Sequence, residues 1–102
     1  MAAYILAEIE VTDPVGYEEY KRLAPASIEI YGGKYLVRGG PAECLEGEWP
    51  SKRLVILEFR DRDQARAWWD SQEYRPARDL RRRTARCSML LVEGIPAPHG
   101  RQ

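Results

Sequence analysis

The sequence is poor in the residues that carry most acid–base and metal chemistry. Its 102 residues include one histidine, His99, and two cysteines, Cys44 and Cys87, which form no CxxC pair. A serine–histidine triad is excluded in practice, because His99 lies in the last few residues of the chain and the triad needs a histidine base. The same scarcity argues against a histidine-bound haem or metal, so we expect no cofactor and no metal site.

An excess of charge and long apolar runs are also missing. Sixteen basic and sixteen acidic residues cancel, which gives no long-range field toward nucleic acid or an acidic membrane surface. No apolar stretch approaches the roughly 20 residues that span a bilayer. The first residues, MAAYILAEIEV, lack the basic segment and the uninterrupted apolar core of a signal peptide. We therefore expect a cytoplasmic protein with free thiols and no membrane partner.

What is present is the pattern of a small α+β domain. Alternating apolar residues predict strands over 3–11, 34–38, 53–59 and 87–93. Apolar residues at helical spacing predict a helix from Pro14 to about Tyr31 and two shorter helices between Asp61 and Thr84. Pro25 should kink or split the first helix, because proline has no amide donor. Residues 42–45 have two interpretations, a loop or strand pairing resumed after a bulge.

The order of these elements predicts a ferredoxin-like βαββαβ fold, with one four-stranded antiparallel sheet and the helices on one face. We expect a single domain over residues 1–95 and a disordered tail over residues 96–102. An uncovered apolar sheet face does not stay in water, so we expect a homodimer with sheet facing sheet. The residues expected on that face are Tyr4, Leu6, Leu36, Leu54, Ile56, Met89 and Leu91.

Four segments carry a family resemblance. They are the GGKYLVRGG block, the LEG turn with Trp49 nearby, the LVILEF strand and the turn from Ser71 to Tyr74. In these segments the chain resembles the DUF1330 family of small bacterial proteins, over residues 3–95. The resemblance implies a dimeric α+β barrel built from two ferredoxin-like protomers. It implies less about activity, because that architecture hosts cofactor-independent monooxygenases, muconolactone-type isomerases, haem enzymes and sensor domains.

The first candidate site consists of charged residues that alternation assigns to the uncovered sheet face. Glu8, Arg38 and Glu58 are predicted to lie there among leucine and isoleucine side chains. Desolvated in a dimer, Arg38 would hold an anion, Glu58 would act as a base and Glu8 would contact the ligand. The alternative is an interface ion-pair network, in which Arg38 bonds to Glu58 or Glu8 and binds no ligand.

Aromatic residues and a basic run supply two further candidates. Tyr20 and Tyr74 are candidate ligand-binding residues if the aromatic side chains line a pocket between sheet and helices. Otherwise they are core residues at helical spacing. Six arginines between residues 75 and 86 are predicted to form a solvated helix face, so we expect no nucleic-acid partner.

Two functions therefore stay open, and the sequence does not decide whether the protein is an enzyme. The first is a homodimer that binds a small polar or aromatic metabolite, or transforms it without a cofactor. The second is a non-catalytic structural or stress-related dimer, whose buried charges only fix the subunit interface. In either case we expect residues 39–52, rich in glycine and proline, to form a mobile loop anchored by Trp49 that reaches over a pocket or toward a partner.

Overall fold

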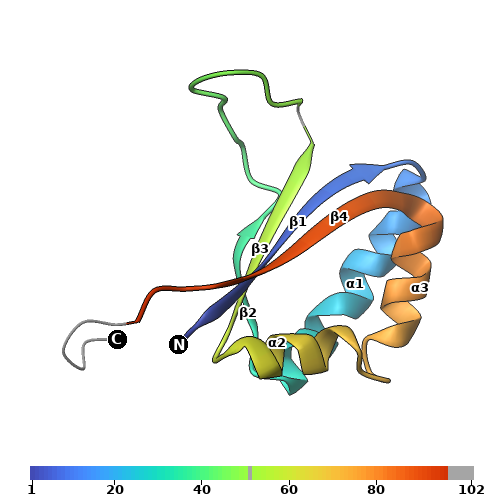
Figure 1. The fold of residues 1–102 in the computed structure, drawn as a ribbon. Helices are drawn as coiled ribbons and strands as arrows, with labels where there is room; N and C mark the ends of the chain where they lie inside the picture. Colours follow the sequence, from blue (N-terminus) through green and yellow to red (C-terminus); the bar gives the residue numbers. More distant parts are fainter. Residues whose placement is uncertain (51, 97–102) are drawn as a thin grey trace.

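The computed structural model describes residues 1–50 and 52–96 as one sheet with helices on one of its faces (Figure 1). The strands are antiparallel in the order β2-β3-β1-β4, which confirms the ferredoxin-like prediction. Apart from Pro96, the predicted tail lies outside the described residues. In chain order the elements are β1 (Ala3–Val11), α1 (Pro14–Ile30), β2 (Lys34–Arg38), β3 (Arg53–Phe59), α2 (Arg62–Trp69), α3 (Arg75–Thr84) and β4 (Ala85–Glu93).

Helix α1 begins where the local signals place it and ends at Ile30, close to the predicted end at about Tyr31. The Asp13 carboxylate accepts a hydrogen bond from an amide of the first turn, and Pro14 follows at a position that needs no amide donor. The helix is not split at Pro25, because Ala24 and Ile28 bury themselves in the core on either side of it. None of the helices in the described residues has both the length and the apolar character to cross a membrane.

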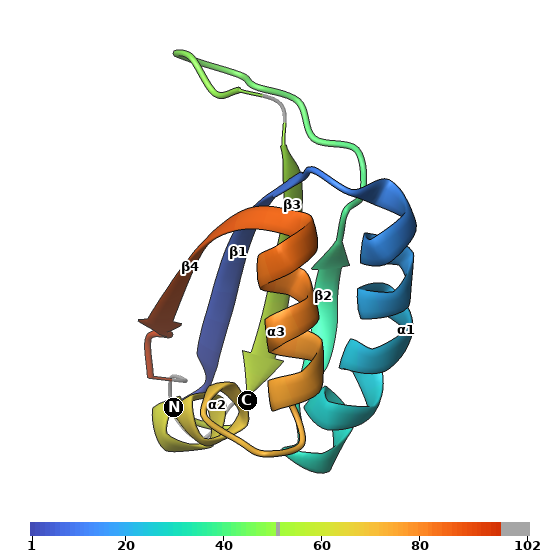
Figure 2. The same ribbon diagram turned by 90° about the vertical axis from the view of Figure 1, so that its right-hand side faces the viewer.

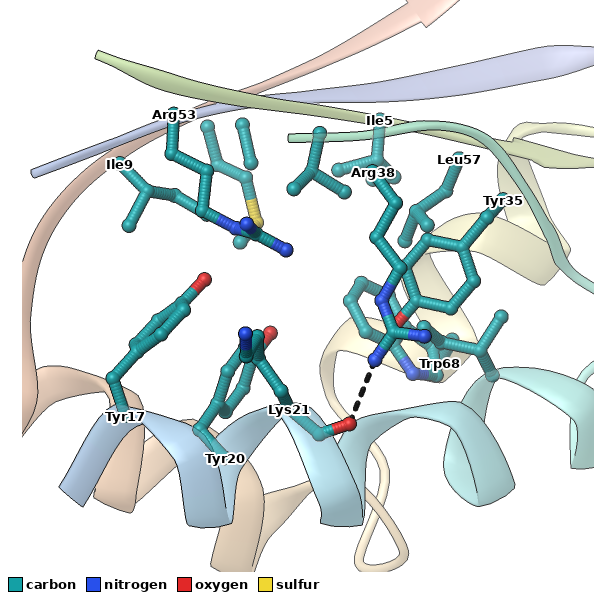
Figure 3. Close-up of a pocket in the computed structure, with 14 residues that line it drawn as sticks. Ile5, Ile9, Tyr17, Tyr20, Lys21, Tyr35, Arg38, Arg53, Leu57 and Trp68 are labelled. Atoms are coloured by element: carbon teal, nitrogen blue, oxygen red, sulfur yellow. Dashed lines mark hydrogen bonds between the residues drawn. The ribbon is translucent and has the colours of Figure 1, made fainter. Parts of the chain in front are cut away.

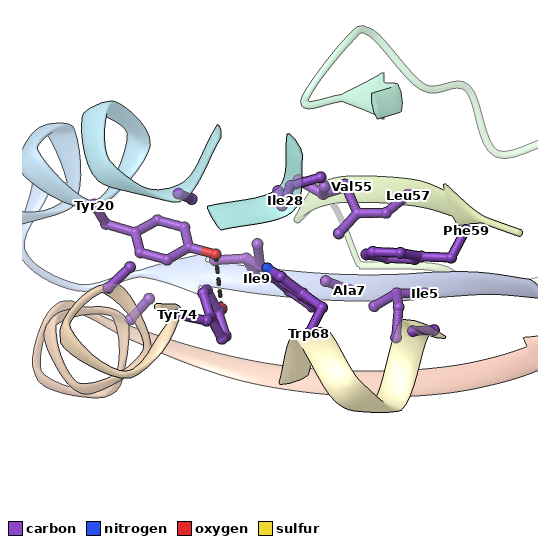
Figure 4. Packing of buried hydrophobic residues seen from close by; sticks show 14 of the residues in the cluster. Ile5, Ala7, Ile9, Tyr20, Ile28, Val55, Leu57, Phe59, Trp68 and Tyr74 are labelled. Atoms are coloured by element: carbon purple, nitrogen blue, oxygen red, sulfur yellow. Dashed lines mark hydrogen bonds between the residues drawn. The ribbon is translucent and has the colours of Figure 1, made fainter. Parts of the chain in front are cut away.

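The core lies between the sheet and the helices, on the face that the alternation of β1 and β3 predicted (Figure 4). Aromatic side chains fill most of it, and the ring centroids of Trp68 and Tyr74 are 4.1 Å apart. The indole Nε1 of Trp68 donates to Ser27 Oγ at 3.1 Å, which satisfies a buried polar group. The sheet contributes Ile5, Ala7, Ile9, Val55, Leu57 and Phe59.

The opposite face of the sheet, which we call the outer face, differs from the prediction in β4. Met89 and Leu91 pair with the buried residues Ala7 and Ile5, and residues directly opposite each other share a face. Met89 and Leu91 therefore pack against the core, and their predicted exposure is wrong. Their neighbours Leu90 and Val92 lie on the outer face instead. The apolar side chains of the outer face are therefore Tyr4, Leu6, Leu54, Ile56, Leu90 and Val92.

A β-bulge in β2 changes the face that the end of this strand presents. The pairing with β3 slips by one residue between Tyr35 and Val37, which leaves Leu36 as the extra residue. A slip of one residue sends every later side chain to the other face. Arg38 is consequently opposite the buried Val55 and faces the helices, so its predicted place on the outer face is wrong.

The segment between β2 and β3 projects from the end of the sheet, and we call residues 39–50 the arm (Figure 1). Every residue of the arm is exposed. Gly39 begins the departure with a positive φ of 72°, a conformation that favours glycine. Within the described residues the arm forms no strand, so the resumed pairing of residues 42–45 is wrong; nothing lies beside them to pair with.

Gly33 is the position at which close packing of this fold is most easily tested. A Cβ at Gly33 would lie 2.5 Å from Cε1 of Phe59 and 2.8 Å from Cγ2 of Ile28. We expect Gly33→Ala to lower the free energy of unfolding by about 1–3 kcal/mol, as overpacked cores do. Gly40→Ala is the matched control, because its Cβ would meet nothing within 4 Å. Urea denaturation of both variants makes the comparison, and equal midpoints would show that Gly33 is not tightly packed.

Candidate binding cleft

A cleft opens on the helix side of the sheet, next to α1 (Figure 3). With its open mouth it holds about 390 Å³ of empty space, of which about 20 Å³ is open to the centre of a water molecule. Apolar side chains of the sheet and Trp68 form much of its wall. Its polar lining consists of three cations and three tyrosines: Lys21, Arg38, Arg53, Tyr17, Tyr20 and Tyr35.

Arg38 reaches across the cleft because the bulge in β2 turns it toward the helices. Its Nη2 donates to the backbone oxygen of Lys21 in α1 at 2.7 Å. Its guanidinium carbon also lies 4.5 Å from the centroid of the Tyr35 ring, a cation–π contact. A guanidinium has five N–H donors, so this arrangement leaves donors of Arg38 free for a ligand.

Arg53 also lines this cleft, although the sequence did not lead us to predict it as a site residue. Its guanidinium carbon lies 5.6 Å from the centroid of the Tyr17 ring. Its Nε is buried and has no hydrogen-bond partner among the described residues, a state that costs free energy. The signal for it was in the sequence, because alternation in β3 puts Arg53 on the same face as Val55 and Leu57.

Behind the cleft lies a chain of buried polar groups. The hydroxyl oxygens of Tyr20 and Tyr74 are 3.0 Å apart, and Arg81 Nε donates to the Tyr74 hydroxyl at 3.3 Å. Tyr20 lines the cleft, whereas Tyr74 is fully buried behind it and does not line it. Arg81 is only 6% exposed, so the predicted solvation of the arginine run is wrong at this residue: it shares the buried stripe of α3 with Ala77 and Thr84.

The tyrosines of the cleft are hydrogen-bond donors rather than bases at neutral pH. Burial raises the pKa of Tyr17 and Tyr35 above the ordinary value of 10.0, and at Tyr17 the nearby Arg53 charge offsets part of this effect. Burial also holds the pKa of Tyr20 well above that value, with Tyr74 adding to the effect. All three hydroxyls are therefore protonated near pH 7.

The predicted carboxylates lie away from the cleft, on the outer face. Glu58 Oε1 is 3.3 Å from Lys34 Nζ, and Glu8 Oε1 is 4.0 Å from Lys52 Nζ. The predicted pairing of Arg38 with Glu58 or Glu8 is wrong, because the bulge puts Arg38 on the other side of the sheet. That Glu58 acts as a base and that Glu8 contacts a ligand stay predictions.

The family is shown by sequence. Residues 2–95 match the model of the domain of unknown function DUF1330, so the chain belongs to this family. No curated protein matches the chain.

Solved structures share the fold at low sequence identity. A protein of unknown function from Rhodopseudomonas palustris is 17% identical with a TM-score of 0.71, over 94% of this chain and 84% of that one. A dimeric protein of unknown function with a ferredoxin-like fold from Bacteroides fragilis is 12% identical with a TM-score of 0.63, over 91% and 96%. SnoaB, a cofactor-independent oxygenase from Streptomyces nogalater, is 13% identical with a TM-score of 0.61, over 96% and 97%.

The buried state of Tyr20 predicts how stability depends on alkaline pH. The folded protein keeps Tyr20 protonated to a higher pH than the unfolded chain does, so its contribution is complete below the ordinary pKa of 10.0. The free energy of unfolding should fall as the pH rises from there through the folded-state pKa. Tyr20→Phe removes the ionisable group and should reduce this slope, measured by urea denaturation at a series of pH values. An unchanged slope would mean that Tyr20 is solvated.

Proposed function

We propose that this protein binds a small anionic molecule with an apolar body in the cleft beside α1. The main support for this proposal is the difference in charge between the cleft and the whole chain. The whole chain has a formal net charge of zero, yet the cleft is lined by Lys21, Arg38 and Arg53 and, among the described residues, by no carboxylate. Lys21 is paired with Glu18 at 2.8 Å, which leaves the two guanidiniums without an ion pair in the part of the chain described.

The donor chemistry of the cleft narrows the ligand class. Guanidinium groups and protonated tyrosines donate hydrogen bonds, so the matching ligand group is an oxygen-rich acceptor. The planar fork of arginine fits a carboxylate with two parallel hydrogen bonds. The apolar wall favours a hydrocarbon or aromatic body. A small aromatic or aliphatic carboxylate combines both features.

Such a ligand needs more room than the cleft has when empty. Only about 20 Å³ is open to the centre of a water molecule, because the arginine side chains occupy much of the space. Arg38 is exposed and held by one hydrogen bond and one ring contact. Outward rotation of this side chain would enlarge the cleft, and side-chain rotations on binding are common.

The residues of the cleft support ligand binding better than they support abstraction of a proton from a ligand. Glu58, the base expected from the sequence, lies on the outer face, and the tyrosines that line the cleft are protonated. If the protein is an enzyme, oxygenation without a cofactor is the reaction to test first, since SnoaB shares the fold. Without a cofactor the electrons that reduce oxygen must come from the substrate, so oxygen consumption would be measured with phenolic carboxylates, whose electron-rich phenolate form can supply them.

We also propose a homodimer joined sheet to sheet, and the outer face supports it. Leu90 is 64% exposed and Val92 42%, beside the partly exposed Leu6 and Ile56. A contiguous apolar face of this kind marks an interaction site. The dimer would bury Glu8 and Glu58 with their lysine partners. In the alternative function, a non-catalytic dimer, these ion pairs would fix the subunit register and no ligand would bind.

The ligand proposal predicts a specific loss on mutation of Arg53. Benzoate and hexanoate should raise the melting temperature, whereas the neutral benzamide and hexanol should not, because only the anions pair with the guanidiniums. At 100 times its dissociation constant a ligand stabilises by about 2.7 kcal/mol. Arg53→Gln should weaken binding at least tenfold, since hydrogen bonds to charged groups contribute about 1.5–3 kcal/mol.

The exposed Arg60, which pairs with Asp61 outside the cleft, gives the matched control Arg60→Gln. This variant should bind as the wild type does. Stabilisation by the neutral compounds, or full binding by Arg53→Gln, would contradict the proposal.

The dimer proposal predicts the effect of a charge at the centre of the outer face. Ile56→Asp should convert the dimer to a monomer at micromolar concentration, because an unpaired carboxylate would be buried between the sheets. Val15→Asp, at an exposed apolar position of α1, is the control and should remain a dimer. Sedimentation velocity separates the two states. A wild type that sediments as a monomer would refute this part.

A further inference from the structure

The arm carries two large apolar side chains that its own protomer leaves uncovered. Leu45 is 88% exposed and Trp49 is 66% exposed. Among the described residues, the side-chain hydrogen bonds within the arm are local, from Cys44 Sγ to the backbone oxygens of Glu46 and Gly47. Tryptophan in a projecting segment is the type of residue that anchors protein interfaces.

The arm also stands on the side of the sheet where a second copy would lie. Figure 1 shows it rising away from the helices, and in Figure 2 it extends beyond the end of the sheet. Its root is fixed, because the Gly39 amide donates to the backbone oxygen of Leu54 at 2.8 Å. The arm therefore continues the outer face rather than covering the cleft.

The arm is acidic and a basic group lies at the same end of the sheet. Residues 39–50 contain three glutamates and no basic residue. At the junction of α3 and β4 the exposed side chains form what we call the arginine group: Arg82, Arg83 and Arg86. Arg86 is opposite Glu10 of β1. The preceding residue of β1, Ile9, is opposite Arg53, where the arm returns to the sheet. The arm and the arginine group are therefore at the same end of the sheet.

Among the described residues no ion pair joins these two groups within one protomer, in which Arg86 pairs with Glu10 instead. β2 and β4 are the two edges of the sheet, three strand spacings apart. At about 4.8 Å for each spacing, roughly 14 Å of sheet separates the arm root on β2 from the arginine group of the same chain. A twofold axis parallel to the strands, however, sets β2 of one sheet opposite β4 of the other. It also places the arm end of one sheet beside the arm end of the other.

We propose that the arm of each protomer lies on a second copy of the chain, with Glu43, Glu46 and Glu48 against the arginine group and Trp49 against the edge of β4. The proposal rests on the dimer part of the proposed function. A second copy is favoured over another protein because both complementary charge groups belong to this chain.

A charge swap tests the contact. In one variant the three glutamates of the arm are replaced by lysine, and in the other the arginine group is replaced by glutamate. Each variant alone should dimerise at least tenfold more weakly at low salt, because like charges then face each other. An equal mixture should form a heterodimer with close to wild-type affinity, since both of its arm contacts again pair opposite charges. Arg22→Glu, on the exposed face of α1, is the control and should dimerise normally.

A second measurement uses the native thiol of the arm. Arg86→Cys should form an interchain disulfide with Cys44 under mild oxidation, whereas Arg22→Cys should not. A wild type that is monomeric would refute the dimer itself. A dimeric wild type whose charge variants associate as tightly as it does, or whose mixture gains nothing, would overturn the arm contact and leave the outer-face dimer and the cleft standing.

Discussion

The pairing register of the strands is the constraint on which the rest of this structure depends. Each strand sends alternate side chains to opposite faces, so a shift of one residue exchanges the core set for the exposed set. In β1 and β3 the register makes one face uniformly apolar apart from Arg53. In β2 the bulge at Leu36 exchanges the faces to which the later side chains point, and this brings Arg38 to the same side of the sheet as Arg53. Without that extra residue Arg38 would lie beside the carboxylates of the outer face.

This register separates charges that cancel in the chain as a whole. The cleft receives guanidiniums and no carboxylate among its described lining, while Glu8 and Glu58 lie on the outer face next to lysines. Arg53 Nε is buried without a hydrogen-bond partner among the described residues, and burial of such a group costs free energy. Local costs of this kind are typical of functional sites. The segregation of charge, more than any single residue, is therefore the feature that distinguishes this cleft from ordinary core packing.

The fold was predictable because its signals are local and repeated. Nine residues of β1 and seven of β3 give several alternations each, and Asp13 with Pro14 defines a helix start. The site was less predictable because it depends on single events. Five residues of β2 are too few to reveal a slip at Leu36, and the position of Tyr74 behind Tyr20 follows from the tertiary packing of α1 on α3. Arg53 could have been found, since a lone arginine on an apolar strand face is itself a signal.

The mouth of the cleft and the root of the arm are one continuous piece of chain. Arg38 contacts α1 across the cleft, and the next residue, Gly39, turns into the arm with its positive φ. Gly39 also packs against the Arg53 side chain so closely that a Cβ there would collide with the guanidinium. A ligand held by Arg38 and Arg53 and a partner held by the arm would thus act on the same end of β2 and β3. Binding free energies are reciprocal, so whatever a ligand adds to dimer stability, dimerisation adds equally to ligand affinity.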